Sequence, residues 1–245
     1  MGIFDILRGQ KDDVAVTRSA LDQANDPTAD DSAITKLIEN ILQIGIDGRK
    51  PFDSAAAVAD EALKKADGDA EEAVSKVIRG HVTTGAAGGL LTSLGGFITM
   101  PVAIPANLLE FYVQATRMTA AVAKLRGYDI TQPNIRTAVL LTLVGSNSDD
   151  VLAKAGITTG SGRLATLALR NMPRSATMMV NKAIGFRLLK SVGGGVLSKF
   201  GKGVPVVGGA VGGVLDGYMM NKIGEQALKE FPREAARAAN EGSTL

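Results

Sequence analysis

Residues 81–109 read HVTTGAAGGLLTSLGGFITMPVAIPANLL, and no formal charge occurs between Arg79 and Glu110. A run of this length could cross a hydrocarbon layer of about 30 Å. Glycine and proline interrupt it, however, at Gly85, Gly88, Gly89, Gly95, Gly96, Pro101 and Pro105. A glycine inside a helix costs about 1 kcal/mol relative to alanine, and proline ends or kinks a helix. We therefore interpret the stretch as a close-packed helical hairpin, with membrane insertion of 81–109 and 203–221 as the alternative.

Small residues recur every four positions in two parts of the chain. They are Gly85 and Gly89 in the first part and Gly209, Gly213 and Gly217 in the second. Small residues at this spacing form a smooth helical face that allows another helix to approach closely. These five glycines are therefore predicted to be helix-packing positions. The late glycine helix, at about 205–217, is the predicted partner of the hairpin.

Helical periodicity runs through the rest of the chain, and no segment shows the alternating polarity of a strand. Asp53 and Asp69 are predicted to cap helices that end before Gly68 and at Gly80. Further helices are predicted at about 34–45, 106–126, 133–145, 148–156, 163–169, 173–189 and 205–230. The predicted fold is all-α, a single compact multi-helix domain with glycine-rich core helices.

The helix predicted at 106–126 carries one polar stripe opposite its apolar face. The stripe consists of Glu110, Gln114, Arg117, Ala121 and Lys124. A helix with one polar and one apolar face is typical of a protein surface. The pattern therefore predicts that this helix touches water.

Four segments can be distinguished along the chain. Residues 1–9 form an amphipathic turn, with Ile3, Phe4, Ile6 and Leu7 on one side. Residues 10–33 are acidic and poor in large apolar side chains, which is typical of a flexible tether. Residues 34–231 form the predicted helical domain, and 232–245 a frayed C-terminal tail. Because so short a helix is unstable alone in water, residues 1–9 need a surface, either their own domain or a membrane interface.

The charge is divided unevenly along the chain. Residues 1–80 hold 10 Lys and Arg against 16 Asp and Glu, whereas 151–215 hold nine basic residues and no acid. Such a basic region predicts an anionic partner. Nucleic acid is not favoured, because the region offers only Phe186 and Phe200 as stacking platforms. The predicted partner is an anionic membrane surface or a membrane protein, contacted through Arg163, Arg170, Arg174, Lys182, Arg187 and Lys190.

The chain lacks the residues on which several common catalytic and metal sites depend. The chain contains no cysteine and one histidine, His81, so thiolate chemistry and two-histidine zinc motifs are excluded. The glycine-rich run 195–203 does not match a phosphate loop, because Gly203 stands where Ser or Thr would bind magnesium. No catalytic residue, metal or cofactor is predicted. The polar residues to suspect in a pocket are Arg117, Tyr128, Asp129 and Asp216.

Several motifs occur in an order that resembles the EcsC family of bacterial proteins. They are LIENILQIGIDG at 37–48, the glycines of 85–96, MPVAIP at 100–105, AKLRGYD at 123–129 and KGVPVVGGAVGGVLD at 202–216. The resemblance covers about 34–230. It implies an α-helical protein, from a family named after a protein encoded beside an ABC transporter, and it carries no catalytic residue over to this chain.

Together these patterns predict a non-catalytic accessory protein that binds the inner face of the bacterial cell membrane. Residues 1–9 lack the apolar core of a signal peptide, and the absence of cysteine fits a reducing compartment, so a cytoplasmic location is expected. The alternative is a pocket protein or enzyme for a hydrophobic ligand such as a lipid. A deep apolar cavity reached by the four suspected polar residues would favour that alternative.

Overall fold

The computed structural model describes residues 31–50, 52–87, 106–144, 152, 173–193 and 208–233. These residues form seven α-helices and one short π-helix, η1, and none of them lies in a β-strand. The elements are α2 Asp31–Leu42, η1 Gln43–Asp47, α3 Ala55–Lys65, α4 Ala70–Ala87, α5 Ala106–Leu125, α6 Pro133–Val144, α9 Arg174–Gly193 and α11 Gly208–Glu230. The all-α prediction is confirmed. Of the helices expected at 148–156 and 163–169, only Leu152 lies within the described residues.

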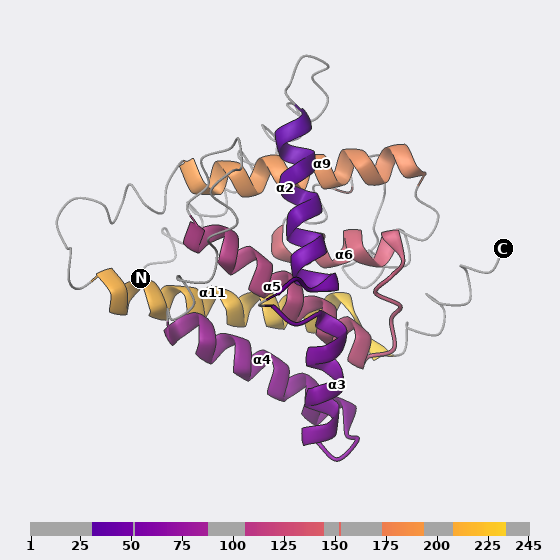
Figure 1. The fold of residues 1–245 in the computed structure, drawn as a ribbon, viewed down its shortest axis with the longest axis vertical. Coiled ribbons are helices and arrows are strands. Elements are labelled where there is room, and N and C mark those ends of the chain that lie inside the picture. The colour runs from indigo at the N-terminus through magenta and orange to yellow at the C-terminus, as the bar shows by residue number, and fades with distance from the viewer. Residues whose placement is uncertain are drawn as a thin grey trace.

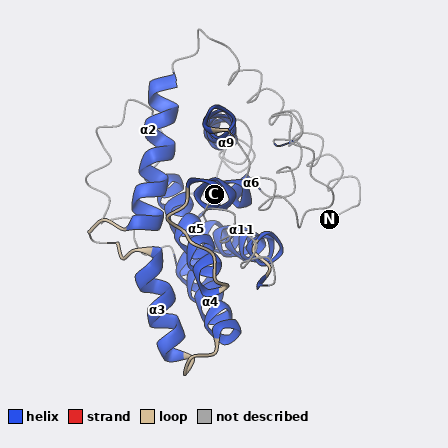
Figure 2. Ribbon diagram, turned by 90° about the vertical axis from the view of Figure 1, so that its right-hand side faces the viewer, coloured by secondary structure: helices blue, strands red, loops and turns tan. Residues whose placement is uncertain are grey.

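Helix α5 lies at the centre of the bundle. It packs against α2, η1, α3, α4, α6 and α11, while α9 packs on α2 and α6. Figure 1 shows α2 and α3 following each other along the long axis, with α9 crossing α2 near one end and α4 beside α11 in the other half. In Figure 2, α9 and α6 are seen nearly end-on, one above the other.

The central position of α5 contradicts the prediction for Glu110, Arg117 and Ala121 that the polar stripe touches water, whereas Gln114 and Lys124 remain partly exposed. Every residue from Leu109 to Ala123 is buried except Gln114. Arg117 is 6% exposed and Glu110 9% exposed, although both belong to the predicted stripe. The physical reason is that neighbouring helices surround α5, so its polar face is covered as well as its apolar face. Only Gln114 and Lys124 of that stripe are half-buried.

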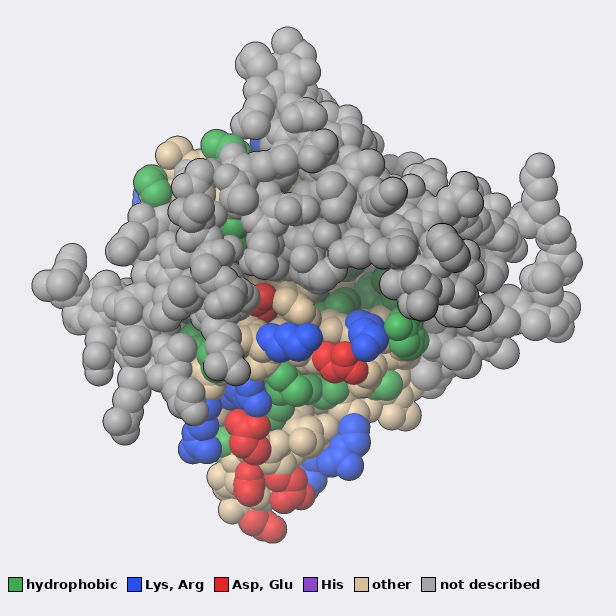
Figure 3. All heavy atoms as spheres, turned by 180° about the vertical axis from the view of Figure 1, so that it is seen from behind, with side chains coloured by type: hydrophobic (Ala, Val, Ile, Leu, Met, Phe, Trp, Pro, Cys, Tyr) green, Lys and Arg blue, Asp and Glu red, His purple; other side chains and the backbone are tan. Residues whose placement is uncertain are grey.

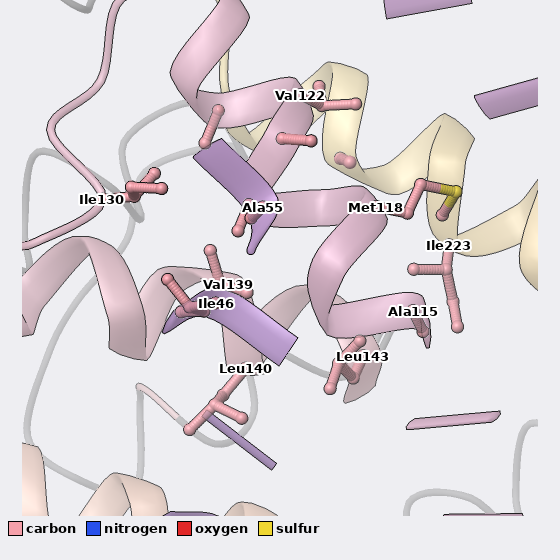
Figure 4. Packing of buried hydrophobic residues seen from close by; sticks show 14 of the residues in the cluster. Ile46, Ala55, Ala115, Met118, Val122, Ile130, Val139, Leu140, Leu143 and Ile223 are labelled. Atoms are coloured by element: carbon pink, nitrogen blue, oxygen red, sulfur yellow. The ribbon is translucent and has the colours of Figure 1, made fainter. Parts of the chain in front are cut away.

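Medium-sized aliphatic side chains build the core around α5. Figure 4 shows Ile46 of η1 beside Val139 of α6, and Met118 of α5 directed toward Ile223 of α11. All four are buried, together with many alanines. Because alanine is small, the helix axes can approach closely, and the core fills without tryptophan.

The helix ends agree with the predictions in part. The Asp69 carboxylate accepts the backbone N–H groups of Glu71 and Glu72, both at 2.9 Å, so Asp69 opens α4 as predicted. The first residue of α3 is Ala55, and Ser54, not Asp53, caps it, with Oγ accepting the N–H of Ala57 at 3.1 Å. The predicted end at Gly80 is also wrong. Helix α4 continues to Ala87 because Gly80 is exposed and keeps helical backbone geometry.

The connection from α2 to α3 depends on two glycines. In η1, a Cβ on Gly45 would lie 2.7 Å from the Cβ of Thr116 on α5, so only glycine allows this approach. Gly48 has a φ of +81°, which L-residues with a side chain rarely adopt. The segment then turns and presents Phe52, whose N–H donates to the carbonyl of Arg49 at 2.7 Å.

Helices α4 and α11 pack along each other, as Figure 1 shows. Helix α4 contains Gly85, and α11 contains Gly209, Gly213 and the buried Gly217. A close glycine contact between them involves a residue that the sequence pattern did not single out. A Cβ on Gly224 would lie 2.9 Å from Cγ2 of Ile78. Gly89 and the rest of the predicted hairpin up to residue 105 lie outside the described residues.

Candidate functional site

Helix α9 combines a buried inner side with an outer side free of acids. Val180, Ala183 and Ile184 are buried toward α2 and α6. On the first turns, Arg174 is exposed and Met178 is 70% exposed. The helix contains four basic residues and no acid. A large apolar side chain in water beside cations marks this side of α9 as a candidate contact surface.

The predicted surface residues are only partly described. Arg174 is exposed at the start of α9, and Lys182 is half-buried in its middle. Arg187 and Lys190 lie in the last part of α9, where the backbone is helical and the side chains are outside the description. The remaining predicted contacts lie outside the described residues: Ile3, Phe4, Ile6, Leu7, Arg163 and Arg170.

The opposite end of the molecule has a different charge pattern. Figure 3 shows basic and acidic side chains intermingled over the end where α3 and α4 lie. Lys65 pairs with Glu61 at 2.6 Å, and Lys76 pairs with Glu72 at 2.8 Å. Since these cations have acidic neighbours on their own helices, their attraction for an anionic surface is reduced.

A second polar feature lies inside the bundle, at Arg117 of α5. Its guanidinium carbon lies 4.8 Å from the centre of the Phe52 ring, and Nη1 donates to Oε1 of Gln114 at 3.3 Å. Nε and Nη2 are buried and have no hydrogen-bond partner among the described residues. Burial lowers the pKa of Arg117, and the charge of Asp53 opposes this effect. A nearly buried cation thus lacks a hydrogen-bonded counter-ion in the described part of the chain.

Two other titratable groups on α4 and α5 are affected by burial. The Nδ1–H of His81 donates to the carbonyl of Val77 at 2.9 Å, since a carbonyl can only accept. Burial lowers the pKa of His81, the Val77 bond raises it, and the positive charge of Arg117 lowers it further. His81 is therefore uncharged at neutral pH. Burial raises the pKa of Glu110, which favours its protonated form.

The suspected pocket residue Tyr128 belongs to a contact between helix ends. Its hydroxyl donates to the carbonyl of Pro232 at 2.7 Å, and its ring meets Phe231 edge-on at 5.2 Å. Burial raises the pKa of Tyr128 to about 12. Tyr128 therefore ties the end of α5 to the end of α11.

Arg126 completes this contact, and the sequence reasoning missed it. Its Nη1 donates to the carbonyls of Leu228 at 2.9 Å and Phe231 at 3.1 Å, and its Nη2 pairs with Glu71 at 2.8 Å. The guanidinium thereby satisfies carbonyls at the C-terminal end of α11, where cations are favoured. The sequence does show a basic residue directly before Gly127, which ends α5. It does not show which other helix the Arg126 side chain would contact.

The other two suspected residues lie elsewhere. The Asp129 carboxylate accepts the Thr131 N–H at 3.0 Å and its hydroxyl at 2.6 Å, and these bonds lower the pKa of Asp129. It organises the turn before α6. Asp216 is half-buried on α11, and burial raises its pKa. Within the described residues, no hydrogen bond or ion pair joins any two of the four suspected residues: Arg117, Tyr128, Asp129 and Asp216.

Metal-binding groups and membrane-spanning helices would both bear on function. The described residues contain no group of three or more His, Cys, Asp or Glu side chains placed to hold a metal ion. Among the helices described, none has both the length and the apolar character needed to cross a bilayer.

These observations define an all-α protein with a basic outer helix and a buried arginine, Arg117, whose Nε and Nη2 have no hydrogen-bond partner among the described residues. A sequence model of the EcsC protein family matches residues 23–233, most of the chain. The chain belongs to the EcsC protein family. No curated protein and no solved structure matches it. The motif at 123–129 that carried the resemblance contains Arg126, Tyr128 and Asp129, so in this structure it holds helix ends together.

Proposed function

We propose that the protein is a non-catalytic accessory protein that binds the inner face of the bacterial cell membrane through α9. The observation that carries this proposal is the outer side of α9, where Met178 is 70% exposed beside Arg174 on a helix without acids. Cations attract anionic headgroups, while an apolar side chain enters the boundary between headgroups and acyl chains. In this proposal, residues 1–9 provide a second contact.

The magnitudes suit reversible attachment. Each Lys or Arg close to an anionic membrane surface contributes about 1 kcal/mol. Full burial of a methionine side chain contributes roughly 1.5–3 kcal/mol. If only Arg174 and Met178 contact the membrane, losing the charge of Arg174 and losing the apolar contact of Met178 should weaken binding by similar amounts. Binding through α9 should also fall as salt rises, because salt screens exposed charges.

Vesicle flotation of the full chain tests the proposal. Vesicles of phosphatidylcholine with added phosphatidylglycerol should recover the protein, and vesicles of phosphatidylcholine alone should recover much less. Arg174→Glu and Met178→Asp should each reduce recovery on anionic vesicles. Lys64→Glu, which reverses an exposed charge on α3, is the matched control and should have no effect.

Three results would contradict parts of the proposal. Equal recovery on both kinds of vesicle would exclude recognition of anionic lipid. Full recovery of a chain lacking residues 1–9 would exclude the N-terminal contact. Retention of the protein in native membranes after carbonate extraction would instead favour insertion of 81–109 or 203–221.

A further inference from the structure

We propose that Arg117 is the centre of a buried site for a monoanionic oxyanion group, either a carboxylate or a phosphodiester. The site lies between α4, α5 and Phe52, which precedes α3. It is separate from the outer side of α9, so it stands or falls independently of the proposed membrane contact.

The contacts of Arg117 leave one edge of its guanidinium without a hydrogen-bond partner. Phe52 covers its face at 4.8 Å, and Gln114 accepts from Nη1 at 3.3 Å. The unpartnered atoms, Nε and Nη2, form the same edge of the guanidinium, and their N–H bonds point in nearly parallel directions. That edge matches two oxygens of a carboxylate or phosphate group. The geometry therefore predicts two-point binding of an oxyanion.

Comparison with two other arginines shows that this edge is unusual in the described part of the chain. Arg136 forms a two-point ion pair with Asp47, at 2.8 and 2.7 Å. Arg126 has two carbonyl acceptors and the carboxylate of Glu71. Arg117 is the most deeply buried of the three and has only a neutral amide acceptor. A buried charge without a hydrogen-bonded counter-ion is costly, and the charge of Asp53 offsets only part of this cost, so a bound anion would stabilise the fold.

The surroundings favour a ligand group with a single negative charge. Asp53 is exposed, and no hydrogen bond joins it to Arg117 among the described residues. His81 adds no positive charge at neutral pH, because burial lowers its pKa. Arg117 is therefore the cation of the site, and the charge of Asp53 already acts on it, so a doubly charged group would add an excess negative charge. A carboxylate or a phosphodiester carries the single charge required.

The site lies one side chain below the surface. Phe52, Gln114 and His81 are each half-buried, and Asp53 is exposed. A ligand would therefore need movement of side chains, without opening of the helical bundle. Since the covering group is the aromatic ring of Phe52, an oxyanion attached to a short apolar chain is expected to bind more tightly than inorganic phosphate.

Calorimetric titration of the full chain tests the inference with three probes: hexanoate, dihexanoyl phosphatidylglycerol below its micelle concentration, and inorganic phosphate. Binding of hexanoate alone would identify a carboxylate source, and binding of the phospholipid alone would identify a lipid headgroup. Either result supports the site. Stronger binding of phosphate than of both organic probes would overturn the monoanion assignment, and no binding of any probe would overturn the site.

Variants show whether binding occurs at Arg117. Arg117→Met should abolish binding and should unfold at the same or a higher temperature than the wild type without ligand, because it removes a buried charge that has no hydrogen-bonded counter-ion. Arg117→Lys keeps the charge but loses the two-point edge, and its Kd should rise about tenfold. Arg136→Met, which breaks a closed surface pair, is the matched control and should bind as the wild type does. Unchanged affinity in both Arg117 variants would refute the site.

Discussion

Replacing Gly45 by alanine should destabilise the protein, although alanine is the better helix former. The new Cβ would lie 2.7 Å from both Cβ and Cγ2 of Thr116 and 3.1 Å from the carbonyl oxygen of Val113. Real Cβ atoms essentially never show contacts below 3.0 Å. Thr116 is fully buried, and its hydroxyl donates to the carbonyl of Tyr112 at 2.7 Å, so rotation of this side chain loses a hydrogen bond.

The magnitude follows from two opposing effects. Overpacking of a filled core costs about 1–3 kcal/mol, and loss of the Thr116 bond would add about 1 kcal/mol. Alanine recovers up to about 1 kcal/mol of helix propensity relative to glycine. The net expectation is a free energy of unfolding about 1–3 kcal/mol lower than that of the wild type. Urea unfolding followed by far-UV circular dichroism measures this difference.

Gly80→Ala is the matched control, because a Cβ on this exposed residue of α4 would have nothing within 4 Å. It should leave stability unchanged or raise it by up to about 1 kcal/mol. Thr116→Ser in the Gly45→Ala chain removes the clashing methyl group and should restore part of the loss. A Gly45→Ala protein as stable as Gly80→Ala would refute the close approach of η1 and α5.

Three further predictions concern polar groups at helix ends and on α5. Arg126→Met should lower the free energy of unfolding by about 2–3 kcal/mol, since two carbonyls at the end of α11 lose a charged donor. Arg136→Met breaks only a surface ion pair and should cost under about 1 kcal/mol in the same urea assay. Tyr128 should ionise at a pH of about 12 in an ultraviolet absorbance titration. The free energy of unfolding should fall as the pH rises above 10.0, because Tyr128 ionises there in the unfolded chain but not yet in the folded protein. A normal pKa for Tyr128 would contradict its burial. Burial raises the pKa of Glu110, so its contribution to stability is present below the unfolded pKa of 4.5 and is lost as the pH rises through the folded pKa. Glu110→Gln should therefore be at least as stable as the wild type at neutral pH. A lower stability of Glu110→Gln would show that the carboxylate is paired.

Helix positions followed from the sequence where the signal is local. Asp69 accepts two backbone N–H groups of its own helix, and Pro133 begins α6 as predicted. Gly127 follows α5 with a φ of +93°, a conformation suited to glycine. The error at Asp53 is one residue, because Ser54 is an equally suitable cap and adopts the extended backbone that a capping residue needs. The error at Gly80 arises because an exposed glycine weakens a helix without ending it.

The candidate sites followed from the sequence less well. Arg117 was selected as a polar residue of α5, but its burial depends on helices far away in the chain. Arg126 was missed because its acceptors, Leu228 and Phe231, lie more than 100 residues later. The basic character of α9 could be seen directly, whereas the exposure of Met178 depends on which side of α9 faces α2 and α6.

Composition and periodicity alone therefore indicate an all-α chain with a basic second half, because capping, helix propensity and charge are properties of neighbouring residues. The order of the sequence motifs adds the resemblance to the EcsC family. Folding adds the contacts between distant segments. It surrounds α5, so that Glu110 and Arg117 of the polar stripe are buried and Arg117 is removed from water. Periodicity identifies the two faces of a helix, but only the packing of the other helices determines whether both are covered.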